Sequence, residues 1–193
     1  MIVAVKKQEN RGDKMIFTII GIISILVIFI LVFIVKNADI SIKLVNMNEA
    51  ELNIKNLLNE KQNIINNIDS FLSNKSDNYK LVREDDETDD LIYLNIILEN
   101  YYNYINEFLI YEDGLVFDDN ENDEINKLKV VTNKLKATIT YYDDNAKIYN
   151  DYKNKGFYKF IFFIKRYKVK ELYITEKEED LEEMIKKTTE NDQ

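Results

Sequence analysis

Two clusters of tyrosine with acidic or amide residues are the part of the sequence whose side-chain types could do chemistry. They are YDD at 142–144 and YND at 149–151, seven residues apart. A phenol beside a carboxylate can act as an acid–base pair, provided that other elements bring further groups to it and shift a pKa. The sequence indicates neither condition. Seven residues are two helical turns, so Tyr142 and Tyr149 are predicted to lie on one packed face of a helix.

The composition argues against most common catalytic and metal-binding arrangements. The 193 residues include no histidine, cysteine, tryptophan or proline. Serine–histidine and cysteine–histidine pairs, disulfides, the usual zinc sites and the helical Glu-x-x-His di-metal site are therefore excluded. We predict no enzyme activity, no catalytic residue, no metal and no cofactor. A pair of carboxyl groups facing each other across a cleft, as in glycosidases, is the one catalytic class left open.

Two acidic stretches could attract a cation. The stretch 118–129 begins like a calcium loop, but Asp123 stands where that loop needs glycine and Lys129 where it needs glutamate. This excludes an EF-hand, and weak adsorption of calcium is left as an alternative. The other stretch, EDDETDD at 84–90, is predicted to be a solvated loop.

The longest apolar stretch of the chain is MIFTIIGIISILVIFILVFIV, residues 15–35, which carries no charge. A helix rises about 1.5 Å per residue, so this stretch spans roughly 30 Å, the thickness of the hydrocarbon core of a bilayer. A signal peptide has a shorter apolar core followed by a small-residue cleavage site, which KNADI does not offer. We predict a retained single-pass transmembrane helix in the cell membrane.

The orientation of this helix depends on the basic residues that flank it. Four precede it, whereas three follow it within about 20 residues: Lys36, Lys43 and Lys55. This small difference favours a cytoplasmic N-terminus. We divide the chain into a charged tail (1–14), the transmembrane helix (15–35), a helical bundle (36–175) and a charged C-terminal tail (176–193).

The part after the apolar stretch is acidic. It keeps 22 basic and 33 acidic residues once the four basic and two acidic residues before the stretch are left out. Phosphate backbones repel such a domain, so we predict no binding to nucleic acid.

Hydrophobic spacing after the apolar stretch is helical throughout. Three helices are predicted, over 53–72, 91–111 and 121–155, with Thr88 or Asp89 capping the second. The buried seam of the third is predicted to follow two heptad lines with Ile139 and Ala146 beside them. The lines are Leu128, Leu135, Tyr142 and Tyr149, and Val131, Thr138, Asn145 and Tyr152. The fold class is therefore all-α: an N-terminal transmembrane helix followed by an antiparallel three- to four-helix bundle with long helices.

The basic and aromatic stretch 153–170 has two interpretations. In the first, it closes the bundle as a short fourth helix through Phe157, Phe160, Ile161 and Ile164. In the second, it forms a patch on the membrane interface, because aromatic and basic side chains together suit anionic lipid. The patch would comprise Lys159, Phe162, Phe163, Lys165, Arg166 and Lys168.

Two segments resemble motifs of the LemA family of bacterial membrane proteins. Residues 141–150, YYDDNAKIYN, are similar to its "YYND-x-V-x-x-YN" helix, and residues 49–68 are similar to its "EAWxNIDxxLxxRxDLIPNLV" segment. Glu51 replaces the tryptophan of the second motif, and Asn66 replaces its proline. The resemblance implies a membrane-tethered antiparallel helical bundle without established enzymatic activity. Some members of the family are associated with membrane-organelle formation or with membrane proteases.

Taken together, these features favour a non-enzymatic scaffold or adaptor at the cell membrane. Its expected partners are the lipid bilayer and other membrane proteins, and homo-oligomers are left open. The alternative is a membrane-tethered sensory or regulatory module that binds a cation or a small ligand.

Overall fold

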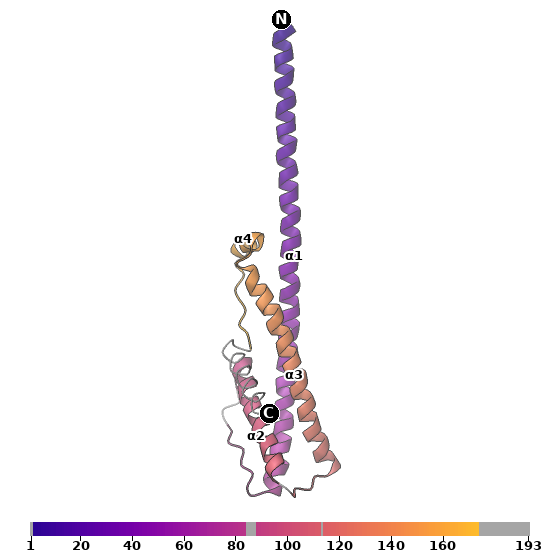
Figure 1. Ribbon diagram of the computed structural model, residues 1–193, viewed down its shortest axis with the longest axis vertical. Helices are drawn as coiled ribbons and strands as arrows, with labels where there is room; N and C mark the ends of the chain where they lie inside the picture. The colour runs from indigo at the N-terminus through magenta and orange to yellow at the C-terminus, as the bar shows by residue number, and fades with distance from the viewer. Residues whose placement is uncertain (1, 84–87, 113, 174–193) are drawn as a thin grey trace, which may run out of the picture. The chain divides into compact units, whose positions relative to one another are not determined.

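The computed structural model describes the backbone of residues 2–83, 88–112 and 114–173, and side chains from residue 14 onward. It contains four helices: α1 (Ile2–Lys75), α2 (Leu91–Tyr111), α3 (Asp119–Tyr152) and α4 (Gly156–Lys165), shown in Figure 1. No strand occurs in these described ranges, which confirms the all-α prediction. Most of the acidic run at 84–90 and the predicted tail at 176–193 lie outside them.

The predicted helix boundaries agree with the structure for α2 and differ by two or three residues for α3. The larger difference concerns α1, because the predicted transmembrane helix and the predicted helix at 53–72 are parts of one unbroken helix. The linking residues, 36–52, contain neither glycine nor proline, so nothing in this stretch favours a break.

The chain divides into two compact units, each described here by itself. Among the described residues, the first unit comprises 2–44 and 149–170, and the second comprises 45–148 and 171–173. Helices α1 and α3 contribute residues to both.

The second unit buries apolar residues from three helices. They are Met47, Ala50, Ile54, Leu58, Ile64, Ile65, Ile68 and Leu72 of α1, Leu94, Ile97, Leu98, Tyr101 and Ile105 of α2, and Leu128, Val131, Leu135, Ile139, Tyr142 and Ala146 of α3. Full burial of an aliphatic side chain contributes about 1.5–3 kcal/mol, so these seams supply the main stabilising free energy of the unit. Most predicted seam residues of the third helix are buried, including Tyr149, which belongs to the first unit. Thr138 and Tyr152 are only half-buried.

A buried lysine connects the three helices of this unit. Lys61 of α1 is fully buried, and its Nζ lies 2.8 Å from Glu99 Oε2 of α2. The other carboxylate oxygen of Glu99 lies 3.0 Å from Nζ of Lys136 of α3. Burial lowers the pKa of Lys61, and the hydrogen bond to Glu99 opposes that change.

Acidic side chains cap the starts of α2 and α3. Asp90 is the N-cap of α2, because its Oδ1 accepts hydrogen bonds from the backbone N–H groups of Ile92 (3.0 Å) and Tyr93 (3.2 Å). The prediction of Thr88 or Asp89 as this cap was wrong.

The acidic stretch that begins like a calcium loop forms the start of α3. Asp118 accepts from the N–H of Glu121 (2.9 Å), and Glu121 accepts from the N–H of Asp118 (2.8 Å). This reciprocal pair is a capping box, which satisfies two backbone donors at a helix start. The carboxylates of this stretch therefore serve the fold.

Candidate functional site

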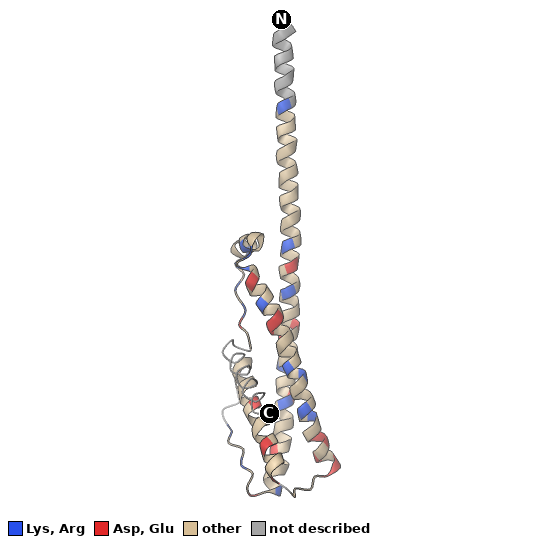
Figure 2. Cartoon of the chain, viewed as in Figure 1, with Lys and Arg blue, Asp and Glu red and all other residues tan. Residues whose placement is uncertain are grey.

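The apolar stretch of α1 is exposed except at Phe33, which is half-buried. Among the described residues, α1 is the one helix that is long and apolar enough to cross a membrane, and none of its most apolar 18-residue window is buried by the rest of the chain. Figure 2 shows this stretch as the long uncharged part of α1 between Lys14 and Lys36. An apolar surface of this size is not stable in water, and its length and composition are compatible with a single-pass membrane protein.

Helix α4 packs against the C-terminal turns of that stretch. The ring of Phe157 lies 5.1 Å from that of Phe29 and 6.4 Å from that of Phe33, both in edge-on arrangements. Phe160 also contacts Phe29, at 6.0 Å between ring centroids. Phe29 and Phe33 precede the end of the apolar stretch, at residue 35, by six and two residues. At 1.5 Å per residue, α4 therefore contacts α1 about 3–9 Å inside the apolar stretch.

A polar network follows directly after the apolar stretch. Lys36 Nζ donates to the Tyr158 hydroxyl (3.0 Å), which donates to Asp39 Oδ2 (2.7 Å). The Tyr158 ring stacks on that of Tyr152 at 4.2 Å. Tyrosine and lysine at this position match the composition of membrane–water interfaces, where one end of a side chain is apolar and the other is hydrated.

The members of the predicted membrane-interface patch lie on α4 and just after it, and they differ in exposure. Phe162 is buried, with its ring 5.1 Å from Tyr149 and 5.6 Å from Tyr167, so its assignment to an exposed patch was wrong. Phe163 is 83% exposed. The basic members Lys159, Lys165, Arg166 and Lys168 are all exposed.

The packing interpretation of α4 is also only partly correct. Ile161 is fully buried as predicted, whereas Phe160 is 43% and Ile164 is 49% exposed. The helix is apolar on more than one face, so its sequence alone did not indicate which face packs. Phe162, and not Ile164, completes the buried face.

The polar residues of the tyrosine clusters bind backbone. In the first unit, the Tyr149 hydroxyl donates to the Lys168 carbonyl (3.0 Å), and the Asn150 amide both donates to the Lys170 carbonyl and accepts from its N–H, each at 2.8 Å. In the second unit, buried Asp143 accepts from the N–H of Tyr173 at 2.9 Å. These groups hold the segment after α4, which fits the predicted structural role.

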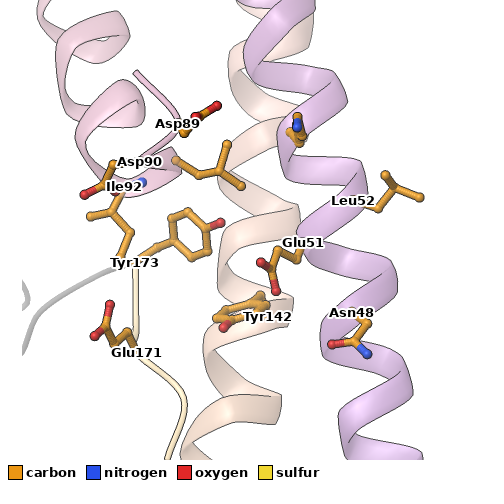
Figure 3. A pocket seen from close by; sticks show the side chains of 11 residues that line it. Asn48, Glu51, Leu52, Asp89, Asp90, Ile92, Tyr142, Glu171 and Tyr173 are labelled. Atoms are coloured by element: carbon orange, nitrogen blue, oxygen red, sulfur yellow. Dashed lines mark hydrogen bonds between the residues drawn. The ribbon is translucent and has the colours of Figure 1, made fainter. Parts of the chain in front are cut away.

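The second unit contains an acidic cavity of about 670 Å³, partly open to solvent. Its lining comes from α1, from the N-terminal end of α2, from α3 and from the segment after α4, as Figure 3 shows. The lining residues are Asn48, Glu51, Leu52, Lys55, Asp89, Asp90, Leu91, Ile92, Tyr142, Glu171 and Tyr173. Four of them are carboxylates and one is an ammonium, so the lining carries a formal charge of −3.

Two tyrosines dominate the inner part of this cavity. Tyr142 is 5% and Tyr173 is 8% exposed, and their rings meet edge to face at 5.2 Å. Both rings lie beside Glu51 in Figure 3. Neither hydroxyl forms a hydrogen bond to any residue that the structure describes.

The carboxylates keep these phenols protonated. Burial, followed by the negative charges of Glu51, Asp143 and Glu171, raises the pKa of Tyr142 to about 12. Burial and Glu51 likewise raise the pKa of Tyr173. At neutral pH both hydroxyls are therefore neutral groups that can donate or accept a hydrogen bond in a negative electrostatic potential.

The cavity carboxylates do not converge on one point. Among the described residues, no group of three or more Asp and Glu side chains has the geometry to hold a metal ion. The negative charge is instead spread over side chains from separate segments.

The sequence interpretation did not assign a site here. Tyr142 was noted as part of a packed seam, Asp89 as a helix cap and Glu51 as a departure from a family motif, while Glu171 and Tyr173 were not singled out. Their segments are remote in the chain, and no local spacing signal connects them.

Comparisons of the chain with protein-family models, with curated proteins and with solved structures gave no match.

Proposed function

We propose that the chain is a membrane-tethered, non-enzymatic helical protein of LemA type that acts as a scaffold or adaptor for protein partners at the cell membrane. One observation carries this proposal: the exposed apolar stretch and the seam buried in the second unit belong to the same unbroken helix, α1. A protein partner bound to the second unit would therefore be connected to the bilayer by continuous helix.

The proposal includes an antiparallel bundle of three long helices in the second unit, with α4 as a short fourth helix of the first unit. It is supported by the buried seams of α1, α2 and α3 and by the ion pairs that join Lys61, Glu99 and Lys136.

Crosslinking tests the adaptor proposal directly. The chain has no cysteine, so Lys129→Cys on the exposed side of α3 gives a single attachment point for a photo-crosslinker in intact membranes. We expect discrete adducts with other membrane proteins, and washing with alkaline carbonate should leave the chain in the membrane fraction. Release by carbonate, or adducts only with lipid at several exposed positions of α3, would contradict the proposal.

The proposal further assigns α4 to the lipid interface. Phe163 and Ile164 are exposed beside a helix contact that lies within the apolar stretch, and exposed Lys159, Lys165 and Lys168 suit anionic headgroups. An amphipathic helix of this kind places its apolar side chains about 5–10 Å into the headgroup and acyl boundary.

A polarity-sensitive dye at Phe163→Cys tests this assignment. In nanodiscs we expect the dye emission to shift to shorter wavelength relative to the same dye at Lys129→Cys. The shift should be larger with anionic than with neutral lipid, because the basic side chains draw α4 toward negative charge. Equal emission from both positions in both lipids would exclude a lipid-facing α4.

The second candidate function is a sensory or regulatory module that binds a cation. The acidic cavity with its two tyrosines favours it.

A further inference from the structure

The negative charge of the acidic cavity is spread over several segments and is not concentrated at one point. Glu51 comes from α1, Asp89 and Asp90 from the start of α2, and Glu171 from the segment after α4. Because the described carboxylates form no metal-holding group, a compact divalent ion would lack the several close oxygen ligands that it needs. An anion would be repelled by the net charge of the lining.

Tyr142 and Tyr173 provide a second, independent observation. Both side chains are more than nine-tenths buried, both line the cavity, and neither hydroxyl has a partner among the described residues. Buried phenols ordinarily find a hydrogen-bond partner within the protein. Because both hydroxyls open on the same cavity and have no protein partner among the described residues, water or a polar ligand can hydrogen-bond to them there.

The chemistry of the lining selects among cations. An ammonium group has three donors for carboxylates and phenolic oxygens, and tyrosine faces attract cations. Leu52 and Ile92 add apolar surface that a methylene chain can cover. A volume of about 670 Å³ lies within the usual range for small-ligand cavities and is far larger than a single metal ion needs.

We propose that this cavity binds an alkylammonium group on an apolar stem, with Glu51 and Glu171 as the anionic partners and the Tyr142 and Tyr173 hydroxyls as hydrogen-bonding groups. The group comes from a free polyamine or from a lysine side chain of a peptide. The inference deepens the sensory candidate function and is independent of the membrane-scaffold proposal, so either can fail alone.

Substitution of Lys55 should change the affinity for the ligand in the direction opposite to loss of a carboxylate. Its ammonium belongs to the lining and competes with an incoming cation for the same carboxylates. Lys55→Gln therefore strengthens binding, whereas a variant that removes a carboxylate or a phenolic hydroxyl weakens it.

The experiment is titration calorimetry on the full chain in nanodiscs of neutral lipid, which does not itself attract polyamines. The probes are spermidine, a tetralysine peptide and magnesium chloride. We expect saturable binding of spermidine or tetralysine, about 5-fold weaker in Glu171→Gln and in Tyr142→Phe, since each variant removes one hydrogen-bonding partner of a charged group. Lys55→Gln should bind about 3-fold more tightly.

The matched control is Glu60→Gln, which removes the same charge from an exposed position of α1 outside the cavity lining. It should leave the affinity unchanged within about 1.5-fold. Circular dichroism checks the fold of Tyr142→Phe. If Tyr142→Phe is destabilised, Glu171→Gln still tests the proposal, because Glu171 is exposed and its substitution should not disturb the fold.

Each outcome decides the proposal. Binding of both spermidine and tetralysine, or of tetralysine alone, supports it. Binding of tetralysine alone identifies a protein side chain as the source of the alkylammonium group. No saturable binding of either amine at millimolar concentration overturns it. Equal weakening by Glu60→Gln and Glu171→Gln overturns it too, because adsorption to an acidic chain would then explain the heat. Stronger binding of magnesium than of either amine also overturns it.

Discussion

Lys61 shows how a charged side chain is accommodated among the apolar residues of the second unit. The ammonium is fully buried, and the carboxylate of Glu99 lies within hydrogen-bond distance of it. Tyr102 places its ring 5.2 Å from the same nitrogen. Removal of a charge from water is costly, so the buried ammonium of Lys61 depends strongly on its ion pair with Glu99. Glu99 depends much less on Lys61, because its side chain is 28% exposed and also pairs with Lys136.

We therefore predict an asymmetry between two variants of this pair. Glu99→Ala leaves the buried ammonium without its carboxylate and should lower the free energy of unfolding by about 3–5 kcal/mol. Lys61→Met replaces the ammonium by an apolar side chain of similar length, and its cost should stay below about 1 kcal/mol. Urea unfolding of the full chain in detergent, followed by circular dichroism, measures both values. A greater loss in Lys61→Met than in Glu99→Ala would contradict the prediction.

Because the pKa of Tyr142 is raised, we predict that the second unit loses stability at alkaline pH. Its pKa is about 12 in the folded chain and about 10 when unfolded, so between these values the unfolded chain binds fewer protons. The free energy of unfolding therefore falls as pH rises through this range, by about 2–3 kcal/mol for this residue.

The measurement is urea unfolding at pH 9 and pH 11.5 for the parent chain and for Tyr142→Phe. The variant should lose less stability between the two values, because phenylalanine does not ionise. Absorbance at 295 nm, which reports tyrosinate, should show Tyr142 among the phenols that ionise late. Identical pH dependence in both proteins would show that Tyr142 titrates normally.

At the scale of elements, the helices begin where local side chains satisfy their backbone donors. Asp90 accepts two backbone hydrogen bonds at the start of α2, and Asp118 exchanges hydrogen bonds with Glu121 at the start of α3. Gly156 begins α4 with φ of +40°, a conformation that side chains with a Cβ rarely adopt. Because the chain contains no proline, the helices begin and end at such local contacts and at Gly114 and Gly156.

Neighbouring aspartates at the start of α2 allow a matched test of the cap. Asp90→Ala removes the acceptor for two backbone N–H groups and should lower the free energy of unfolding by about 1 kcal/mol. Asp89→Ala removes the same charge one residue earlier without removing that acceptor, so its effect should be less than half as large. Thermal unfolding followed by circular dichroism compares the two. Equal losses would assign the effect to charge near the helix start and not to the cap.

At the scale of the whole molecule, the flanking charges of the apolar stretch predict its orientation. Four basic residues precede the stretch and three follow within about 20 residues, which favours a cytoplasmic N-terminus. A membrane-impermeant maleimide should then label Lys129→Cys in intact cells. Gln8→Cys, which keeps all four preceding basic residues, should react only after permeabilisation. The absence of native cysteine makes each label specific. The reverse pattern would place the N-terminus outside.

Much of the fold could be predicted because it depends on patterns along the chain. The uncharged stretch at 15–35 indicated a membrane-spanning helix, and the seven-residue spacing of Leu128, Leu135, Tyr142 and Tyr149 indicated one buried helical face. The boundaries of α2 followed from the same periodicity. Phe162 and Asp90 were assigned wrongly, because α4 is apolar on several faces and three successive residues at 88–90 could each cap a helix.

The sequence by itself determined that most of the chain is helical and which stretch is too apolar for water, since both depend on neighbours within a few residues of one another. It did not indicate that α1 continues through residues 36–52. Only the tertiary structure decided that Lys61 is buried against Glu99, that Phe157 packs on Phe29, and that Glu51, Tyr142 and Tyr173 share one cavity. These contacts join residues that are 31 to 128 positions apart, and no periodicity connects such positions. Their proximity depends on which helical faces bury together, a choice made by packing across the whole fold.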